Sequence, residues 1–348
     1  MSNQPPIEVP QGAIRLNTDS QKLEFFAQDR WYEMATDTPN LGNSPVGVRG
    51  LFAGKFDDSS NNGTIDHVTI SSQGNAIDHG DLINSVQFYG GMNSSDRRWI
   101  YFGGAPGNPT NQMQFGEIST TGNGVDFGNL TESTHYNPSG VGNRTRGVRM
   151  GGSVDPSGGA QNTMDFWTYD SLGNAVDFGD LVAGKRFSYS ANSPTRGMIS
   201  GGDFTNPSVG DEINQFITIA STGNAQTFGD LSSVLQYGGG NGACSNAVKG
   251  MFGGGGKKGT TKQTDVEAIF MATTGESFKF GDLTVGRDYS GSTASATRGV
   301  WGGGYSPSYV NTIDYLNIAT GGAAVDFGDR TVAGSYISAC SNGHGGLG

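Results

Sequence analysis

One sequence pattern recurs six times along the chain at a spacing of about 50 residues. Each copy begins with a basic residue and a glycine, which lead into apolar residues and a pair of glycines. An alternating segment, a Gly-Asn-type turn and a motif close to Asp-Phe-Gly-Asp-Leu follow. The opening basic residues are Arg49, Arg98, Arg146, Arg196, Lys249 and Arg298. Because a period of roughly 40 to 50 residues with several strand signals is typical of β-propellers, the sequence predicts an all-β, six-bladed β-propeller.

The last complete copy indicates how one repeat forms four strands. Residues 289–294 are almost all small, as expected of a strand that crowds against its neighbours near a propeller axis. Residues 298–301 form the second strand, and 312–318 alternate polar and apolar side chains like a half-buried third strand. Gly321-Gly322 fits a two-residue hairpin, and 324–327 form the outer strand. Each copy is therefore expected to form an antiparallel meander.

The first and last copies are incomplete in complementary ways. The first copy begins at its second strand, 49–52, without a small-residue strand before it. A small-residue segment at 335–341 stands alone after the last complete copy. We expect this segment to pair with the first copy and remove its open edge, so that 41–348 form one propeller closed by the C-terminal strand.

Residues 1–40 lie outside the repeats. Strand signals at 13–17, 22–26 and 30–34 predict a short N-terminal β-meander, with 18–21 as its first turn. So small a sheet has little core of its own. This segment is therefore expected to pack on the repeats or to dock onto another chain.

Composition excludes several classes of partner. The chain has a formal charge of −11 and only 21 Lys and Arg residues, so nucleic-acid binding is not expected. It contains no run of 18 apolar residues, so membrane insertion is not expected. The first residues lack the basic and apolar regions of a signal peptide. Although 59 residues are Gly, the 19 Phe and 12 Tyr favour a packed all-β protein over disorder.

Residues suited to catalysis or metal binding do not converge. Of four histidines, only His67 and His79 share a copy, and His79 replaces the repeated Phe, which favours packing over a metal ligand. The closing-motif Asp recurs in separate copies, which favours turn capping over the paired carboxylates of glycoside hydrolysis. Cys244 and Cys340 occupy equivalent positions and are expected to be buried, unbridged side chains. We therefore predict no catalysis, cofactor or metal, and expect the repeated basic residues to bond carbonyls or aspartates of neighbouring copies.

The connections between second and third strands vary in length and sequence, whereas the turns between third and fourth strands are uniform. A divergent face is where ligand recognition would be encoded. Glycan sites combine aromatic faces with a few polar groups. The candidate ligand-binding residues on this face are Phe56, Asp57, Phe204, Tyr305 and Tyr309. The alternative, that these are ordinary solvated loop residues, stays open.

The Gly pair and the four-strand unit resemble the Kelch and galactose-oxidase type of β-propeller. The usual outer-strand Trp of Kelch repeats is replaced by Phe127, Phe178, Phe228, Phe280 and Phe327. The repeats resemble more closely those of marine bacteriophage proteins, particularly cyanophage virion and tail-fibre proteins, over roughly 47–345. The segments that carry this resemblance are 176–181, 297–304 and 311–315. Residues 12–19 and 22–25 likewise resemble a short module of phage tail fibres.

These resemblances imply a non-enzymatic virion protein that is assembled in the host cytoplasm. The expected function is that of a tail-fibre or tail-tip component recognising a host-surface glycan or another receptor. Residues 1–40 would contact other virion proteins or support a homo-oligomer. The alternative is a capsid decoration or baseplate adaptor protein with purely structural protein contacts.

Overall fold

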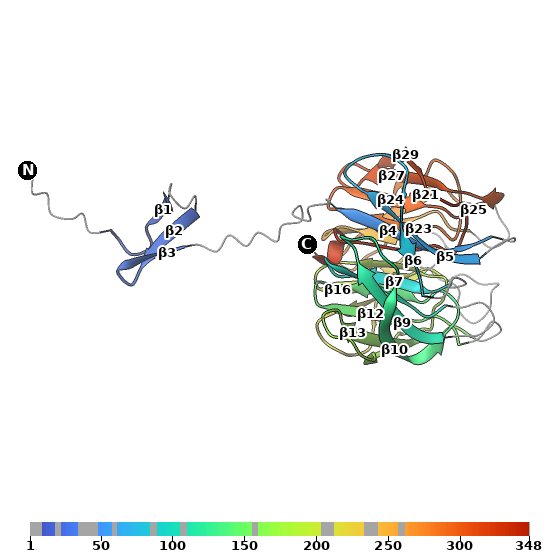
Figure 1. Cartoon of the computed structure of the whole chain (residues 1–348), viewed down its shortest axis with the longest axis horizontal. Helices are drawn as coiled ribbons and strands as arrows, with labels where there is room; N and C mark the ends of the chain where they lie inside the picture. The colour runs from blue at the N-terminus through green and yellow to red at the C-terminus, as the bar shows by residue number, and fades with distance from the viewer. Residues whose placement is uncertain are drawn as a thin grey trace, which may run out of the picture. The chain divides into compact units, whose positions relative to one another are not determined.

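The structure is a computed structural model of the chain (Figure 1). It describes residues 9–17, 22–33, 48–57, 61–83, 89–104, 110–154, 159–202, 212–232, 243–256 and 262–347. The chain divides into two compact units, the N-terminal unit (1–40) and the repeat unit (41–348). The described residues form β-strands and one short 3-10 helix, η1 (Gly345–Leu347). In this described part, no helix has the length and apolar character needed to cross a membrane.

The N-terminal unit is a three-stranded antiparallel meander, as predicted. Its strands are β1 (Ile14–Asn17), β2 (Lys22–Ala27) and β3 (Arg30–Glu33). Phe25 stacks on Tyr32 with ring centroids 5.5 Å apart. Ile14, which pairs with Phe25, and Leu16 on the same side are 62 % and 60 % exposed. The unit therefore buries little apolar surface of its own, and its predicted first turn, 18–21, lies outside the described residues.

The repeat unit contains six sheets of at least four strands among its described residues, which we number I to VI. Sheet I contains β4 (Arg49–Phe56), β5 (Asn61–Thr69), β6 (Ile77–Asp81) and β30 (Ser338–Ser341). Sheet II contains β7 (Gly91–Ser94), β8 (Arg98–Phe102), β9 (Thr110–Glu117) and β10 (Val125–Thr134). Sheet III contains β11 (Ser139–Gly142), β12 (Arg146–Met150), β13 (Thr163–Thr168) and β14 (Val176–Asp180).

The other three sheets have the same antiparallel order of four strands, and sheet V contains an additional short strand, β28 (Gly322–Ala323). Sheet IV contains β15 (Tyr189–Asn192), β16 (Arg196–Ser200), β17 (Ile213–Thr218) and β18 (Gln226–Asp230). Sheet V contains β19 (Ala243–Ser245), β20 (Lys249–Gly253), β21 (Asp265–Phe270), β22 (Phe278–Asp282) and β28 (Gly322–Ala323). Sheet VI contains β23 (Gly291–Ala294), β24 (Arg298–Gly302), β27 (Thr312–Asn317) and β29 (Val325–Asp329). A small hairpin joins β25 (Tyr305–Ser306) to β26 (Ser308–Tyr309).

One predicted hairpin is more elaborate than expected. Gly321 and Gly322 do lie between the last two strands of sheet VI, but Gly322 begins β28. β28 pairs in parallel with β22, so the turn of one sheet extends its neighbour. The predicted two-residue turn therefore describes this segment only in part, because Gly322 also pairs with a strand of the adjacent sheet.

The innermost strand of each sheet is made mainly of small residues, apart from side chains such as Met92 and Tyr189, and most of its residues are buried. Each innermost strand contacts those of two other sheets, and the series β30, β7, β11, β15, β19 and β23 returns to β30. At Gly291 no side chain fits without a shift, since a Cβ there would lie 2.7 Å from Ile337. In sheet I, the innermost strand is β30, which pairs with β4 and confirms the pairing predicted for the C-terminal segment.

Apolar side chains fill the spaces between adjacent sheets. Six buried clusters among the described residues each combine side chains from two neighbouring sheets. Trp99 packs with Leu51 between sheets I and II, and Phe327 packs with Phe52 between sheets VI and I. Both faces of each sheet are therefore covered.

The repeated basic residues tie each sheet to the next. Each donates a hydrogen bond to a backbone carbonyl just beyond the third strand of the following sheet, over 2.8–3.2 Å. The donor and acceptor pairs are Arg49–Ile118, Arg98–Tyr169, Arg146–Ile219, Arg196–Met271, Lys249–Ile318 and Arg298–Ile70. The last pair leads back to sheet I. The carbonyl bonds expected from the sequence are thus confirmed.

The repeated turn and closing motif also meet across sheets. The Asn174 Oδ1 accepts a hydrogen bond from the Asn129 backbone N–H at 3.1 Å, and Asn224 does the same for Asp180. The closing-motif residue is therefore held through its backbone, whereas the sequence predicted turn capping by its carboxylate. Gly128 has φ +147°, and a Cβ there would lie 2.2 Å from the Gly173 carbonyl oxygen.

A pair of alanine substitutions separates backbone strain from this close approach. Gly173 has φ +146° but no atom within 4 Å of its Cβ position. Gly173→Ala should cost about 1–3 kcal/mol from strain alone. Gly128→Ala should cost about 1–3 kcal/mol more, because its Cβ also meets the neighbouring sheet. Urea unfolding measures both, and equal losses would contradict the inter-sheet contact.

Candidate functional site

Three of the predicted ligand-binding residues lie together. The Phe56 and Tyr309 rings have centroids 6.1 Å apart, and Tyr309 and Tyr305 are 5.2 Å apart. All three side chains are half-buried. Asp57 forms an ion pair with Lys55 at 2.7 Å and is held beside this group by the chain. The fifth candidate, at position 204, lies outside the described residues.

Five further aromatic residues extend this group, and the sequence analysis missed them. Each precedes an innermost strand by two or three residues. They are Tyr89, Tyr136, Phe187, Tyr289 and Tyr336. Tyr336 contacts Phe56, Tyr89 and Tyr289, with centroid separations of 5.6, 4.2 and 4.0 Å. We call these five residues, with Phe56, Tyr305 and Tyr309, the aromatic cluster.

Contacts run through the whole cluster. Tyr136 lies 4.9 Å from Tyr89 and 5.3 Å from Phe187, and Phe187 lies 6.0 Å from Tyr289 (centroid distances). Offset and edge-to-face rings at 4.5–7 Å attract one another in addition to their area burial. Residues from sheets I, II, III, IV and VI are thereby joined at one site.

The backbone of the cluster is unusual. Tyr89, Phe187, Tyr289 and Tyr336 have φ values of 64°, 54°, 56° and 57°. Bulky residues rarely adopt this left-handed region, and each such residue costs on the order of 1–3 kcal/mol. Strain of this kind persists where the surrounding structure requires it and is concentrated at functional sites. The repetition of one strained conformation indicates that it positions the rings.

The cluster presents neutral hydroxyl groups. Burial raises the pKa of Tyr89 to about 12, and burial together with the neighbouring Tyr289 and Tyr89 also raises the pKa of Tyr336. These phenols therefore remain protonated at neutral pH. The cluster combines aromatic faces with hydrogen-bonding hydroxyls, a combination that suits the apolar face and hydroxyl groups of a sugar.

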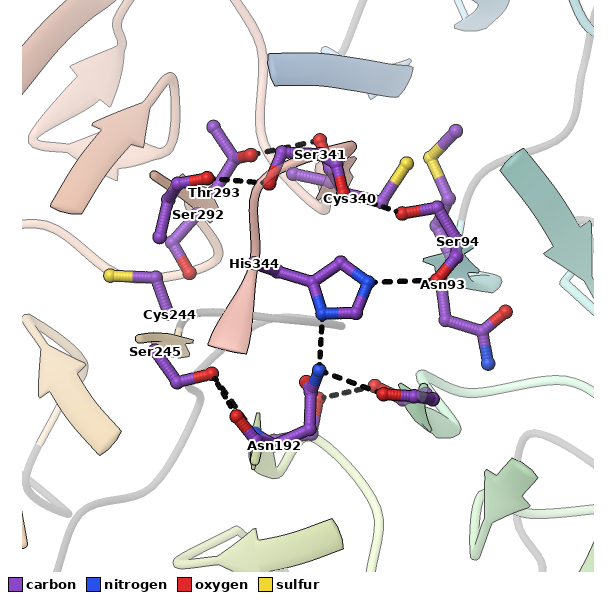
Figure 2. A pocket seen from close by; sticks show the side chains of 16 residues that line it. Asn93, Ser94, Asn192, Cys244, Ser245, Ser292, Thr293, Cys340, Ser341 and His344 are labelled. Atoms are coloured by element: carbon purple, nitrogen blue, oxygen red, sulfur yellow. Dashed lines mark hydrogen bonds between the residues drawn. The ribbon is translucent and has the colours of Figure 1, made fainter. Parts of the chain in front are cut away.

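A small cavity of about 40 Å³ lies among the innermost strands (Figure 2). Its hydroxyls donate hydrogen bonds to carbonyls of adjacent sheets. Examples are Ser94 to Ser341, Ser341 to Ala294, Thr293 to Cys340 and Ser190 to Gly140. His344 points into the cavity, where it contacts the Ser94 carbonyl at 2.8 Å and Asn192 at 2.5 Å. Burial lowers the pKa of His344 to about 4, so the imidazole is neutral at pH 7.

The remaining chemical candidates occupy structural positions. His79 is buried, and its Nε2 contacts the Glu117 carbonyl of sheet II at 3.1 Å. His67 packs edge-on against it. Cys244 and Cys340 are buried and unbridged, as predicted. Within the described ranges, no three His, Cys, Asp or Glu side chains are grouped to hold a metal ion.

No family model and no curated protein matches this chain. Among solved structures, the chain is similar to the one described as the structure of YjhT. The TM-score is 0.56 and the sequence identity 10 %, over 72 % of this chain and 86 % of that one. At this identity the likeness concerns the fold alone, which agrees with an all-β chain of small antiparallel sheets.

Proposed function

We propose that the repeat unit is a six-bladed Kelch-like β-propeller in which each of sheets I to VI is one blade. The strongest support is the set of six basic residues whose carbonyl bonds lead from sheet to sheet and back to the first. The innermost strands follow the same closed order. The similarity to YjhT is consistent with this assignment.

We further propose that the protein is a non-enzymatic phage virion component that recognises a host-surface glycan from a tail fibre or tail tip. The aromatic cluster is the observation that supports recognition, because it gathers eight rings beside variable connections. The virion setting rests on the sequence resemblance to cyanophage proteins. In this setting, the N-terminal unit docks onto other virion proteins through the side that carries Ile14 and Leu16.

The double variant Tyr305→Ala/Tyr309→Ala tests recognition. Both residues belong to a half-buried surface hairpin, so the variant should fold and lose no more than a few degrees of melting temperature through the lost Phe56–Tyr309 and Tyr305–Tyr309 ring contacts, at about 0.5–1.5 kcal/mol per pair. Binding of the purified protein to host cells should fall about ten-fold or more, which corresponds to a loss of about 1.4 kcal/mol for the two removed rings together. Phe270→Ala, which removes a half-exposed ring at the far end of its strand, is the matched control. Unchanged cell binding by the double variant would reject the proposal.

The position on the particle is tested separately. Antibody against the repeat unit, visualised with gold in electron micrographs of purified virions, should label the tail or its fibres. Label over the head would instead support the decoration protein considered above. Unlabelled particles would reject the virion assignment.

A further inference from the structure

The segment that follows β30 packs among the innermost strands. We call residues 342–347, which include η1, the plug. The Asn342 Oδ1 accepts a hydrogen bond from the Arg49 N–H of sheet I at 2.8 Å, and the Leu347 carbonyl accepts one from the Arg144 side chain of sheet III at 2.9 Å. η1 also contacts β15 and β19, which belong to sheets IV and V. The plug is therefore held by several sheets at once.

The plug fits closely against these strands. A Cβ at Gly346 would lie 1.9 Å from the Gly142 carbonyl oxygen, and a Cβ at Gly345 would lie 2.2 Å from the Asn192 carbonyl oxygen. Leu347 is 1 % exposed. Because the fit leaves so little space, a change in the hydrogen bonds of the plug must either be accommodated in place or move the plug out.

His344 makes the central hydrogen bonds of the plug (Figure 2). Its Nε2 lies 2.8 Å from the Ser94 carbonyl oxygen, which can only accept, so Nε2 carries a hydrogen. Its Nδ1 lies 2.5 Å from the Asn192 Nδ2 and accepts the Gly346 N–H at 3.1 Å. The Asn192 Nδ2 also donates to the Gly142 carbonyl at 3.1 Å, which fixes the orientation of the amide. Nδ1 therefore faces two N–H donors, and this arrangement selects the neutral imidazole.

Protonation of Nδ1 is incompatible with this arrangement. It would place a third N–H against two donors, in a site where burial lowers the pKa of His344 to about 4 and the bond from Nε2 opposes the shift. The charged side chains that act on His344 are Asp96, which raises its pKa, and Arg144, which lowers it. These two form an ion pair with each other at 3.1 Å, so their effects on an imidazolium oppose one another. Cys244 and Cys340 also line the cavity, and burial raises the pKa of both thiols, which stay neutral.

We propose that His344 is a proton-operated latch, which holds the plug among the innermost strands while its imidazole is neutral and releases the plug when Nδ1 is protonated. The six sheets stay paired after release, because β30 lies before the plug and keeps its pairing with β4. Water then replaces the hydrogen bonds of the plug. The polar cavity beside His344 has a volume of about 40 Å³, which exceeds the roughly 10–15 Å³ that one water needs.

The pH window of the latch follows from the two states of His344. After release the imidazole titrates near its ordinary pKa of about 6.5, whereas in the plug burial lowers the pKa to about 4. Because the pKa is lower in the closed state, closure is fully favoured above the higher value and weakens as the pH falls toward the lower one. The equilibrium constant for release should therefore rise about ten-fold per pH unit between about pH 6.5 and 4, and no further below that.

Hydrogen exchange of the full chain between pH 4 and 8, followed by mass spectrometry and corrected for the intrinsic pH dependence of exchange, measures release. Protection of the plug amides should fall about ten-fold per pH unit below about pH 6.5. Protection of β11 and β15 should stay constant, because the innermost strands remain paired. His344→Gln keeps a donor for the Ser94 carbonyl but has no ionisable group, so protection of its plug should not depend on pH.

His79→Gln is the matched control. Burial also lowers the pKa of His79 to about 4, but this residue lies on β6 and contacts the Glu117 carbonyl of sheet II. Its removal should leave the pH dependence of the plug as in the wild type. If that dependence disappears in His79→Gln, the titrating group is not His344 and the latch is wrong, whether or not His344→Gln folds.

Three further results would overturn the proposal. The wild-type plug could keep its full protection down to pH 4, or His344→Gln could show the same pH dependence as the wild type. The innermost strands could also lose protection together with the plug. In that case protonation would unfold the repeat unit as a whole, and the plug would not be a separate element that His344 holds.

Discussion

Deletion of residues 334–348 should abolish the cooperative unfolding of the repeat unit or lower its melting temperature by more than about 10 °C. The deletion removes β30, which pairs with β4 through four residue pairs. Ser338 and Ser341 of this strand also donate to the Gly90 and Ala294 carbonyls, at 2.7 and 2.6 Å, in the two adjoining sheets. Losing Ile337, which is fully buried, alone costs about 1.5–3 kcal/mol. With the ladder bonds at roughly 1 kcal/mol each, the loss approaches the total stability of a typical domain, about 5–15 kcal/mol.

Thermal unfolding followed by circular dichroism measures this effect, and light scattering reports aggregation through the exposed edge of β4. Deletion of residues 1–40 is the control, because that segment forms a separate compact unit and its loss should leave the main transition in place. Ala339→Asp keeps the chain length and buries a carboxylate in the same strand, so it should reproduce much of the loss. A truncated chain with the wild-type transition would contradict closure by β30.

The repeat period predicted most of the fold because it reports the same local chemistry six times. Small residues marked the innermost strands, and alternation marked β27, observed at Thr312–Asn317 against a predicted 312–318. The missing strand of the first copy, together with the isolated segment 335–341, predicted the pairing of β30 with β4. These features are local or depend on counting strands. They can therefore be predicted from the sequence without knowledge of three-dimensional contacts.

The aromatic cluster was only partly predictable, for a geometric reason. Phe56, Tyr305 and Tyr309 were found because they lie in variable connections, where recognition was expected. Tyr89 and Tyr336 are 247 positions apart and contact each other only because equivalent positions converge beside the innermost strands. An aromatic residue two or three positions before five of the six innermost strands was the available signal. That these rings meet depends on the left-handed backbone conformation of four of them, which the sequence pattern does not specify.

The sequence analysis also missed a set of buried polar residues, because the third strands that carry them alternate between polar and apolar residues. Each third strand carries, at an equivalent position, a polar residue that is almost fully buried: Asp66, Gln114, Asp165, Gln215, Glu267 and Asp314. In a sheet with one solvated face, such positions would point to water. Here both faces are covered, and each side chain accepts a hydrogen bond from the preceding sheet, either from the segment that follows the outer strand or, for Asp165, from Thr131 near the end of β10. In sheets I, III and VI the partner of the carboxylate includes a buried arginine.

Asp66→Ala should therefore destabilise the repeat unit by about 3–5 kcal/mol. Asp66 Oδ2 accepts from the Arg330 Nε at 3.0 Å, and both side chains are fully buried. Burial already lowers the pKa of Arg330, and the Asp66 carboxylate opposes that shift. Removing the carboxylate leaves a buried guanidinium without its counter-charge, which accounts for the expected loss. Thr331, which also donates to Asp66, loses its acceptor in the same variant.

Urea unfolding at pH 7 of Asp66→Ala, Arg330→Leu and Asp66→Leu/Arg330→Leu separates the cost of an orphaned charge from the value of the pair. The double variant should lie much closer to wild type than either single variant, because replacing a buried ion pair by apolar groups is often neutral or stabilising. Asp282→Ala, in the exposed pair with Lys279, should change stability little and serves as the control. If Asp66→Ala behaves like Asp282→Ala, the inter-sheet ion pair does not hold sheet VI against sheet I. If the double variant is as unstable as the single ones, the pair stabilises the fold in its own right and its charges cannot be exchanged for packing.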